Sequence, residues 1–293
     1  MGVDVPISRL WADVTVKWHS HQPDGHHDQH GGGPPRAAAL LAFAEARSAL
    51  LAGRLDEART GFAIAAGVPG CTLAHVGIGD VAAASGDWHA AELAFRRARA
   101  IGGDHPLITI GLAQTTVAAG DPWSAVAELD RLDRSLSPDH DWHTLRRVVR
   151  YYLAAALLAA TDNARTRLEG EPPVITSRRQ LEVCAHIAHR VLELDVGYPE
   201  LTEQAQTLLD QVADGSRWIW DRRPAAVCGA LSVVTGLGTV ITGGLLGSVA
   251  MVLAGVAIGP TLTFWTVMGY RRESWRRTAE DVAPRVWRRG IPD

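Results

Sequence analysis

The chain has 293 residues, a formal net charge of −3 and a mean hydropathy of +0.01, which averages a polar body with a very apolar C-terminal insert. Ten arginines against five acidic residues give residues 215–293 a charge of +5, which leaves −8 for residues 1–214. An acidic body argues against broad nucleic-acid binding, and three widely spaced cysteines exclude a disulfide framework. Lys17 is the single lysine in the chain, which we interpret as a genomic GC bias.

The first 18 residues carry enough apolar character for a short strand or a docking segment, but not for a domain. The apolar positions are Leu10, Trp11, Val14, Val16 and Trp18. An acidic residue stands early and no apolar core follows it, so this stretch does not resemble a secretory signal. We expect the body of the protein to lie in a reducing cytoplasm.

A histidine-rich stretch follows, in which Gly, Pro, Asp and Gln separate His19, His21, His26, His27 and His30. Such a composition cannot bury an apolar face, so it predicts a flexible linker. Clustered imidazoles also bind zinc or nickel, and a weak metal site is the alternative interpretation. We assign residues 1–36 to an N-terminal segment with this linker, and we expect no cofactor.

Residues 37–214 show helical periodicity that repeats. Each of three glycines is followed by small or bulky apolar residues at offsets +5, +9 and +12: Gly53 by Ala58, Phe62 and Ala65; Gly86 by Ala91, Phe95 and Ala98; Gly120 by Ala125, Leu129 and Leu132. The glycines are 33 and 34 residues apart. This pattern resembles the tetratricopeptide repeat, a helix-turn-helix unit of that period. Small residues let two helices approach and the bulky residue fills the gap between them.

The resemblance covers about three units, over residues 38–135. It departs from the family where Ala42, His75 and Thr109 replace the aromatic residue early in the first helix of each unit, and where Pro69 and Pro106 are not at matching offsets. A related solenoid of divergent helical pairs is the alternative. A further helix through Tyr152 is predicted to be a fourth, capping unit, and two more helices complete the domain. The predicted fold class is therefore all-α, a tetratricopeptide-like solenoid followed by a two-helix transmembrane hairpin.

The resemblance also implies a groove lined by the first helix of each unit. Arg47, Asp80, Gln114 and Arg147 fall at equivalent places, 33, 34 and 33 residues apart, and Arg150 borders them. A ladder of polar groups on a concave face suits an extended peptide or its terminal carboxylate. Solvated polar residues on a helical surface are the alternative.

The stretch from Pro224 to Tyr270 contains no Asp, Glu, Lys, Arg or His over 47 residues. One helix needs about 20 apolar residues to cross roughly 30 Å of hydrocarbon, so this stretch fits two crossings. We predict the turn at residues 242–244. Residues 215–270 are then a juxtamembrane segment with a transmembrane hairpin, and residues 271–293 a basic tail.

Tryptophan, tyrosine and arginine flank both sides of the hairpin. They are Trp218, Trp220, Arg222 and Arg223 before it, and Trp265, Tyr270, Arg271, Arg272 and Trp275 at its end. By the positive-inside rule both flanks, and so both termini, lie on the cytoplasmic side of the inner (plasma) membrane. The tail is either a helix lying along anionic headgroups or an ordinary stop-transfer flank.

Glycines within the hairpin fall at GxxxG spacing, as Gly243 with Gly247 and Gly255 with Gly259. Small residues at this spacing let helix backbones approach closely in lipid. They predict either tight packing inside the hairpin or self-association between chains as a homo-oligomer.

The sequence contains no GxSxG, HExxH or phosphate-binding GxxxxGK[ST] motif, so we expect no enzymatic activity. His186 and His189 near Cys184 are interpreted as ordinary helix residues. The leading hypothesis is a membrane-anchored scaffold or adaptor that binds a protein or peptide at the cytoplasmic face. The alternative is a membrane-perturbing, pore-forming effector of a bacterial conflict or defence system, whose hairpin is controlled by the helical domain.

Overall fold

A computed structural model describes residues 7–20, 34–136, 143–167, 172–220, 222–269 and 271–289. The chain divides into two compact units, one of residues 1–164 and 186–208 and the other of residues 165–185 and 209–293. Within the described residues, extended pairing is limited to two three-residue strands and a single bridge between Thr166 and Val174. The predicted all-α repeat fold is confirmed.

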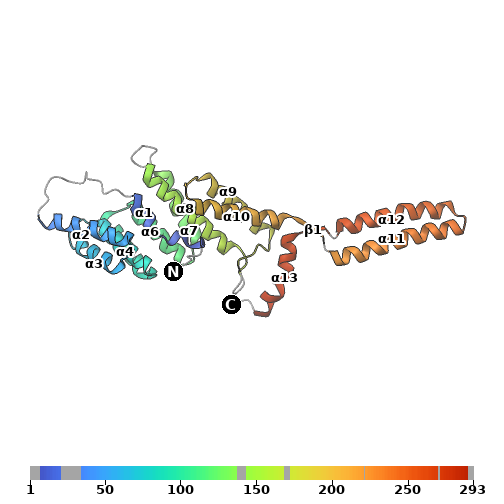
Figure 1. Cartoon of the computed structure of the whole chain (residues 1–293), viewed down its shortest axis with the longest axis horizontal. Helices are drawn as coiled ribbons and strands as arrows, with labels where there is room; N and C mark the ends of the chain where they lie inside the picture. The colour runs from blue at the N-terminus through green and yellow to red at the C-terminus, as the bar shows by residue number, and fades with distance from the viewer. Residues whose placement is uncertain are drawn as a thin grey trace. The chain divides into compact units, whose positions relative to one another are not determined.

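The first unit contains three successive helical hairpins, which Figure 1 shows as antiparallel pairs, with one longer helix after them. The hairpins are α2 (Pro34–Leu51) with α3 (Leu55–Ala66), α4 (Thr72–Ala84) with α5 (Trp88–Gly102), and α6 (Pro106–Ala118) with α7 (Pro122–Ser135); the longer helix is α8 (His143–Ala164). Helices α2, α4, α6 and α8 also contact one another in that order. The first helices of the units therefore form one continuous layer.

Each hairpin turns at one of the glycines that define the repeat. Gly53, Gly86 and Gly120 have φ angles of 75°, 81° and 91°, a left-handed conformation that side chains with a Cβ disfavour. Asp87 and Asp121 follow the second and third of these glycines, and their side chains accept hydrogen bonds from the backbone N–H groups of Ala90 and Ser124. The sequence thus specifies both the reversal and the start of the second helix.

Phenylalanine rings fill the space between the hairpins, as the repeat pattern predicts. Phe62 and Phe95 are fully buried. A Cβ added at Gly77 would lie 2.5 Å from the Phe62 ring, and one added at Gly79 or Gly111 would lie 2.6 or 2.5 Å from the Phe95 ring. Glycine on one helix thus makes room for the aromatic ring of its neighbour.

We expect Gly111→Ala to destabilise the repeats by about 1–3 kcal/mol, because the methyl group has no space against the Phe95 ring. Urea denaturation measures the loss. The control is Gly111→Ala combined with Phe95→Leu, where a smaller side chain restores room, so the double variant should lose less than the sum of the two singles. Additive losses would mean that the two residues do not compete for space.

The N-terminal residues fold as short helices against the repeats, and the strand alternative for this stretch is wrong. They form a 3₁₀ helix, η1 (Ile7–Ala12), and a helix α1 (Thr15–Ser20). The 3₁₀ helix contacts α6 and α8, and α1 contacts α2 and α8. Helices α9 (Arg178–Glu193) and α10 (Pro199–Ser216) follow later in the chain and contribute to both units.

The second unit contains a long apolar hairpin with strands at its base. Strand β1 (Trp218–Trp220) pairs antiparallel with β2 (Arg271–Glu273), and between them run α11 (Arg222–Leu245) and α12 (Val249–Gly269); α13 (Ser274–Arg289) follows. The turn lies at residues 246–248, where Gly247 has a φ angle of 65°, so the predicted turn at residues 242–244 is wrong. Those residues continue α11, in which the Thr242 hydroxyl donates to the Gly238 carbonyl.

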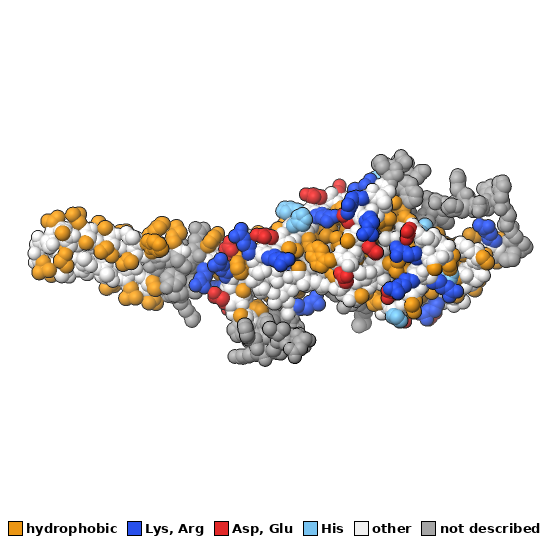
Figure 2. Space-filling view, turned by 180° about the vertical axis from the view of Figure 1, so that it is seen from behind, with side chains coloured by type: hydrophobic (Ala, Val, Ile, Leu, Met, Phe, Trp, Pro, Cys, Tyr) orange, Lys and Arg blue, Asp and Glu red, His pale blue; other side chains and the backbone are white. Residues whose placement is uncertain are grey.

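Most of the large apolar side chains that the structure exposes belong to this hairpin. Seventeen of the 24 in the described residues lie between Val227 and Met268. Figure 2 shows the same surface as orange and white, with neither blue nor red on its described part. Val227–Leu245 is, within the described residues, the span long and apolar enough to cross a membrane, and the apolar stretch of α12, Val249–Trp265, is shorter.

Candidate functional site

The candidate site is the inner face of the repeats, which we define as the surface of α2, α4, α6 and α8 that contacts residues 7–20. From here on, the N-terminal segment means residues 7–20. Three positions of the predicted ladder lie on this face: Asp80 and Gln114 are buried and Arg47 is half-buried. Each of them bonds to the N-terminal segment rather than standing open to solvent.

Lys17 lies at the centre of the site with its side chain fully buried. Its Nζ is 2.5 Å from Asp80 Oδ1 and 2.9 Å from Gln114 Oε1, and it lies 5.1 Å from the centre of the Phe95 ring. An ammonium group has three N–H donors, and these three neighbours offer two oxygens and an aromatic face. The repeats thus form an enclosed site for one ammonium group.

Trp18 occupies an aromatic pocket beside this site. Its ring is fully buried, with ring centres 5.9 Å from both Phe43 of α2 and Phe62 of α3. The indole Nε1 donates to Asp80 Oδ2 over 2.7 Å. One carboxylate therefore bonds to two consecutive residues of the segment, Lys17 through Oδ1 and Trp18 through Oδ2.

Side chains of the inner face also bind backbone carbonyls along the segment. Gln114 Nε2 donates to the Trp11 carbonyl over 2.8 Å, and Arg47 Nη2 donates to that of Trp18. Two hydroxyls of α8 complete the set, because Tyr151 donates to the Leu10 carbonyl over 3.3 Å and Tyr152 donates to the Asp13 carbonyl. Four backbone carbonyls of the segment thus accept hydrogen bonds from side chains of the inner face.

Burial changes the protonation equilibria at this site. It raises the pKa of Asp80 to about 6, although the charge and hydrogen bonds of Lys17 and the Trp18 N–H oppose the shift. It lowers the pKa of the Lys17 ammonium, against the attraction of Asp80. Burial, with the nearby Asp13 and Asp80, raises the pKa of the Tyr152 hydroxyl well above its ordinary value, so Tyr152 remains a donor. The pair depends on mutual neutralisation in a site without water contact.

Tyr152→Phe should weaken the attachment of the segment by about 1 kcal/mol, because the Asp13 carbonyl loses its donor. Chemical denaturation monitored by tryptophan fluorescence would report the loss. Tyr151→Phe is the matched control on the same helix, and its longer bond predicts a smaller effect. Equal losses in the two variants would contradict the assignment of Tyr152 as the main hydroxyl contact.

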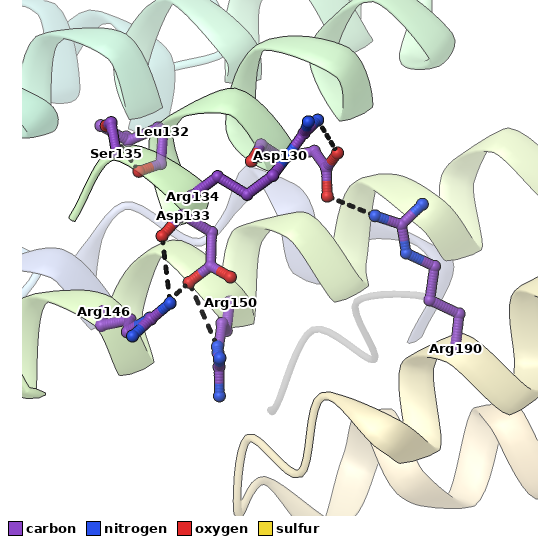
Figure 3. A network of polar contacts seen from close by, with 8 residues as sticks. All are labelled: Asp130, Leu132, Asp133, Arg134, Ser135, Arg146, Arg150 and Arg190. Carbon is purple, nitrogen blue, oxygen red and sulfur yellow. Dashed lines mark hydrogen bonds and ion pairs between the residues drawn. The ribbon is translucent and has the colours of Figure 1, made fainter. Parts of the chain in front are cut away.

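The two remaining ladder residues, Arg147 and Arg150, have other surroundings. Arg147 is exposed, and Arg150 Nε lies 3.1 Å from Asp133 Oδ1. Figure 3 shows that Arg146 shares the same carboxylate, while Asp130 pairs with Arg134 and Arg190. The pairs of Asp133 join α7 to α8, and the pair of Asp130 with Arg190 joins α7 to α9.

Sequence reasoning missed Lys17, Trp18, Tyr151 and Tyr152 as members of this site. The repeat register extended the ladder to Arg147, whereas the contacts on α8 come from tyrosines about one turn later. The single lysine of the chain is also a fully buried cation within the described residues, and this single occurrence is the signal in the sequence that points to the site.

The structure brings three of the four predicted hairpin glycines into the contact between α11 and α12. A Cβ at Gly255 would lie 2.9 Å from the Gly236 carbonyl oxygen, one at Gly259 would lie 3.4 Å from the Gly236 Cα, and one at Gly243 would lie 2.8 Å from the Val252 nitrogen. Gly247 lies in the turn, with nothing within 4 Å of an added Cβ. Gly236 of α11 thus lies opposite Gly255 and Gly259 of α12, and Gly243 lies opposite Val252.

The flanking residues gather at the base of the hairpin. Trp218 pairs with Glu273 and Trp220 with Arg271 across the two strands, and Arg222 and Arg223 begin α11. Trp218 and Trp265 are exposed. Trp275 Nε1 donates a hydrogen bond to Glu273 Oε2 over 2.6 Å, and Arg272 forms an ion pair with Glu280. Tyr270 lies outside the described residues.

The histidine-rich stretch cannot be placed as a metal site. His19 is exposed at the end of α1, and His21, His26, His27 and His30 lie outside the described residues. Over the residues that are described, no three His, Cys, Asp or Glu side chains converge as metal ligands would. His186 and His189 are exposed, whereas Cys184 is buried.

Comparison with known proteins supports the repeat interpretation over part of the chain. A family model for the tetratricopeptide repeat matches residues 82–149, from the last residues of α4 to the first turns of α8. No curated protein and no solved structure matches the chain. Residues 82–149 are thus similar to the tetratricopeptide repeat, a module that serves protein–protein interaction.

Proposed function

We propose that this protein is a membrane-anchored adaptor, in which tetratricopeptide-like repeats bind a protein or peptide and the apolar hairpin holds the complex at a membrane. The main observation is the combination of an uncharged, solvent-exposed apolar hairpin with a repeat face built from converging polar side chains. Exposed apolar patches of this extent mark surfaces that another phase or molecule covers.

The dimensions of the hairpin support a membrane as that phase. Helices of 24 and 21 residues are about 36 and 31 Å long, against roughly 30 Å of hydrocarbon. The pairing of β1 with β2 holds the two helix ends that lead out of the hairpin beside each other. Two crossings would therefore return the chain to the side on which it entered.

Charge supports the cytoplasmic side for both flanks. Arginines begin α11 and follow α12, while residues 246–248 of the turn carry no charge. Helix α13 carries arginine and tryptophan together, and the Arg276 guanidinium lies 5.3 Å from the Trp275 ring centre. Such a helix suits anionic headgroups next to the hairpin. Glycine contacts inside the hairpin favour packing within one chain over self-association between chains.

The test is to express the full chain in bacteria, wash the membranes with alkaline carbonate and treat them with protease from the cytoplasmic side. The proposal requires that the protein remain in the pellet and that protease remove the repeats. Release by carbonate would refute the anchor. Expression of residues 215–293 alone distinguishes the adaptor from a membrane-perturbing effector, because the effector fragment should collapse the membrane potential and the anchor fragment should not.

A further inference from the structure

Contacts to the N-terminal segment come from four consecutive first helices rather than from one neighbour. Arg47 of α2, Asp80 of α4, Gln114 of α6 and two tyrosines of α8 bond to the segment one after another. Four of these bonds end on backbone carbonyls, which any peptide provides. This distribution is how a groove holds a peptide laid along it.

Backbone carbonyls do not distinguish one sequence from another, whereas the side chains of Lys17 and Trp18 do. The carboxylate of Asp80 bonds to Lys17 with one oxygen and to Trp18 with the other. Gln114 and the Phe95 ring complete the ammonium site, and Phe43 and Phe62 enclose the indole. The inner face therefore recognises a lysine followed directly by a tryptophan.

The residue type at position 17, a lysine and not an arginine, fits the ammonium site formed by Asp80, Gln114 and Phe95. The other 28 of the 29 Lys and Arg residues in the chain are arginines, yet the cation of this site is lysine. A guanidinium has five donors in a rigid plane, whereas the site presents Asp80, Gln114 and one aromatic ring. A compact ammonium with three donors matches that number of partners.

The segment also has the properties of a ligand that orders on binding. Its helix α1 has six residues, which is too short to be stable alone in water. Val14, Val16 and Trp18 are buried, and polar contacts also fasten the segment. A buried ion pair contributes specificity more than stability compared with apolar residues of the same size. Such a segment can exchange with a competitor that makes the same bonds.

We propose that the inner face binds a short helical segment of a partner protein that presents adjacent lysine and tryptophan side chains, and that residues 7–20 are the chain's own copy of this ligand. The partner must displace that copy. This inference rests on the proposed adaptor function and names the chemistry of its partner.

The experiment measures binding of a fluorescent peptide with the sequence of residues 7–20 to the full-length protein in detergent, by anisotropy. The wild-type protein, whose site is filled, should bind the peptide at least about thirtyfold more weakly than the Lys17→Met protein, whose own segment has lost its anchor. Lys17→Met combined with Asp80→Leu should not bind it. A peptide with Lys17→Trp and Trp18→Lys, of identical composition, should bind neither protein.

Every other outcome overturns the proposal. Equal binding to the wild-type and Lys17→Met proteins, equal binding of the exchanged peptide, or no binding at all would show that the site does not read a lysine–tryptophan pair. A loss of helix content by circular dichroism in the Lys17→Met protein larger than the six residues of α1 account for would show that the segment is a fixed part of the core. Carbonate extraction of the same proteins tests the anchor independently, so a failure of either idea is recognised by itself.

Discussion

Lys17→Met should lower the free energy of unfolding of the repeats by about 3–5 kcal/mol, because the folded protein must either keep the Asp80 carboxylate buried without a charge partner or release the N-terminal segment with its buried side chains. This is the largest effect expected of a single substitution in the first unit. The measurement is urea denaturation followed by circular dichroism. The matched control, Lys17→Met with Asp80→Leu, removes both charges and should recover most of the loss.

The loss should also depend on pH. In the folded form in which the segment still covers Asp80, loss of the Lys17 ammonium, which lowers the pKa of Asp80, shifts that pKa further above its ordinary value of 3.8. A carboxyl with a raised pKa in the folded state favours folding below pH 3.8, and this contribution is lost as the pH rises through the folded pKa. The penalty of Lys17→Met should therefore be largest above pH 7 and shrink towards pH 4; a penalty independent of pH would contradict a buried Asp80.

Val234→Arg should reduce insertion of the hairpin by roughly a hundredfold, since an arginine near the middle of a membrane span costs about 3 kcal/mol. Val234 lies near the centre of the Val227–Leu245 span and is 67% exposed, away from the glycine contact with α12. The expected result is a shift of the protein from the carbonate-washed pellet to the supernatant.

Val234→Leu is the control for this substitution, because it keeps the surface apolar and should leave the protein in the pellet. Circular dichroism of the repeats should be the same in both variants. If Val234→Arg stayed in the pellet like Val234→Leu, the exposed face of α11 would not contact lipid, and the hairpin would need another covering.

Periodicity predicted the parts of the fold that depend on local chemistry. A glycine with positive φ is required at each hairpin turn, and the alanines and phenylalanines after it fall at fixed offsets, so Gly53, Gly86 and Gly120 reveal the repeat directly. The stretch of 47 residues without Asp, Glu, Lys, Arg or His likewise predicts the hairpin. The predicted turn at residues 242–244 is wrong because these residues continue α11, where Gly243 allows close contact with Val252.

The site depended on tertiary contacts that no sequence period encodes. Asp80 and Gln114 were predicted to face a groove from their register, yet nothing local indicates that a segment more than 60 residues earlier covers them. Composition alone attributes the single lysine to genomic bias, because a count carries no information on where Lys17 lies. Its burial gives that occurrence a physical reason.

The most direct test of the central claim is hydrogen–deuterium exchange of the full-length protein, read on the backbone amides of residues 10–19. The structure predicts slow exchange there in the wild-type protein and fast exchange in Lys17→Met, with the amides of α9 unchanged. Exchange of residues 10–19 at the rate of an unstructured chain in the wild-type protein would contradict the account, because the inner face would then be empty.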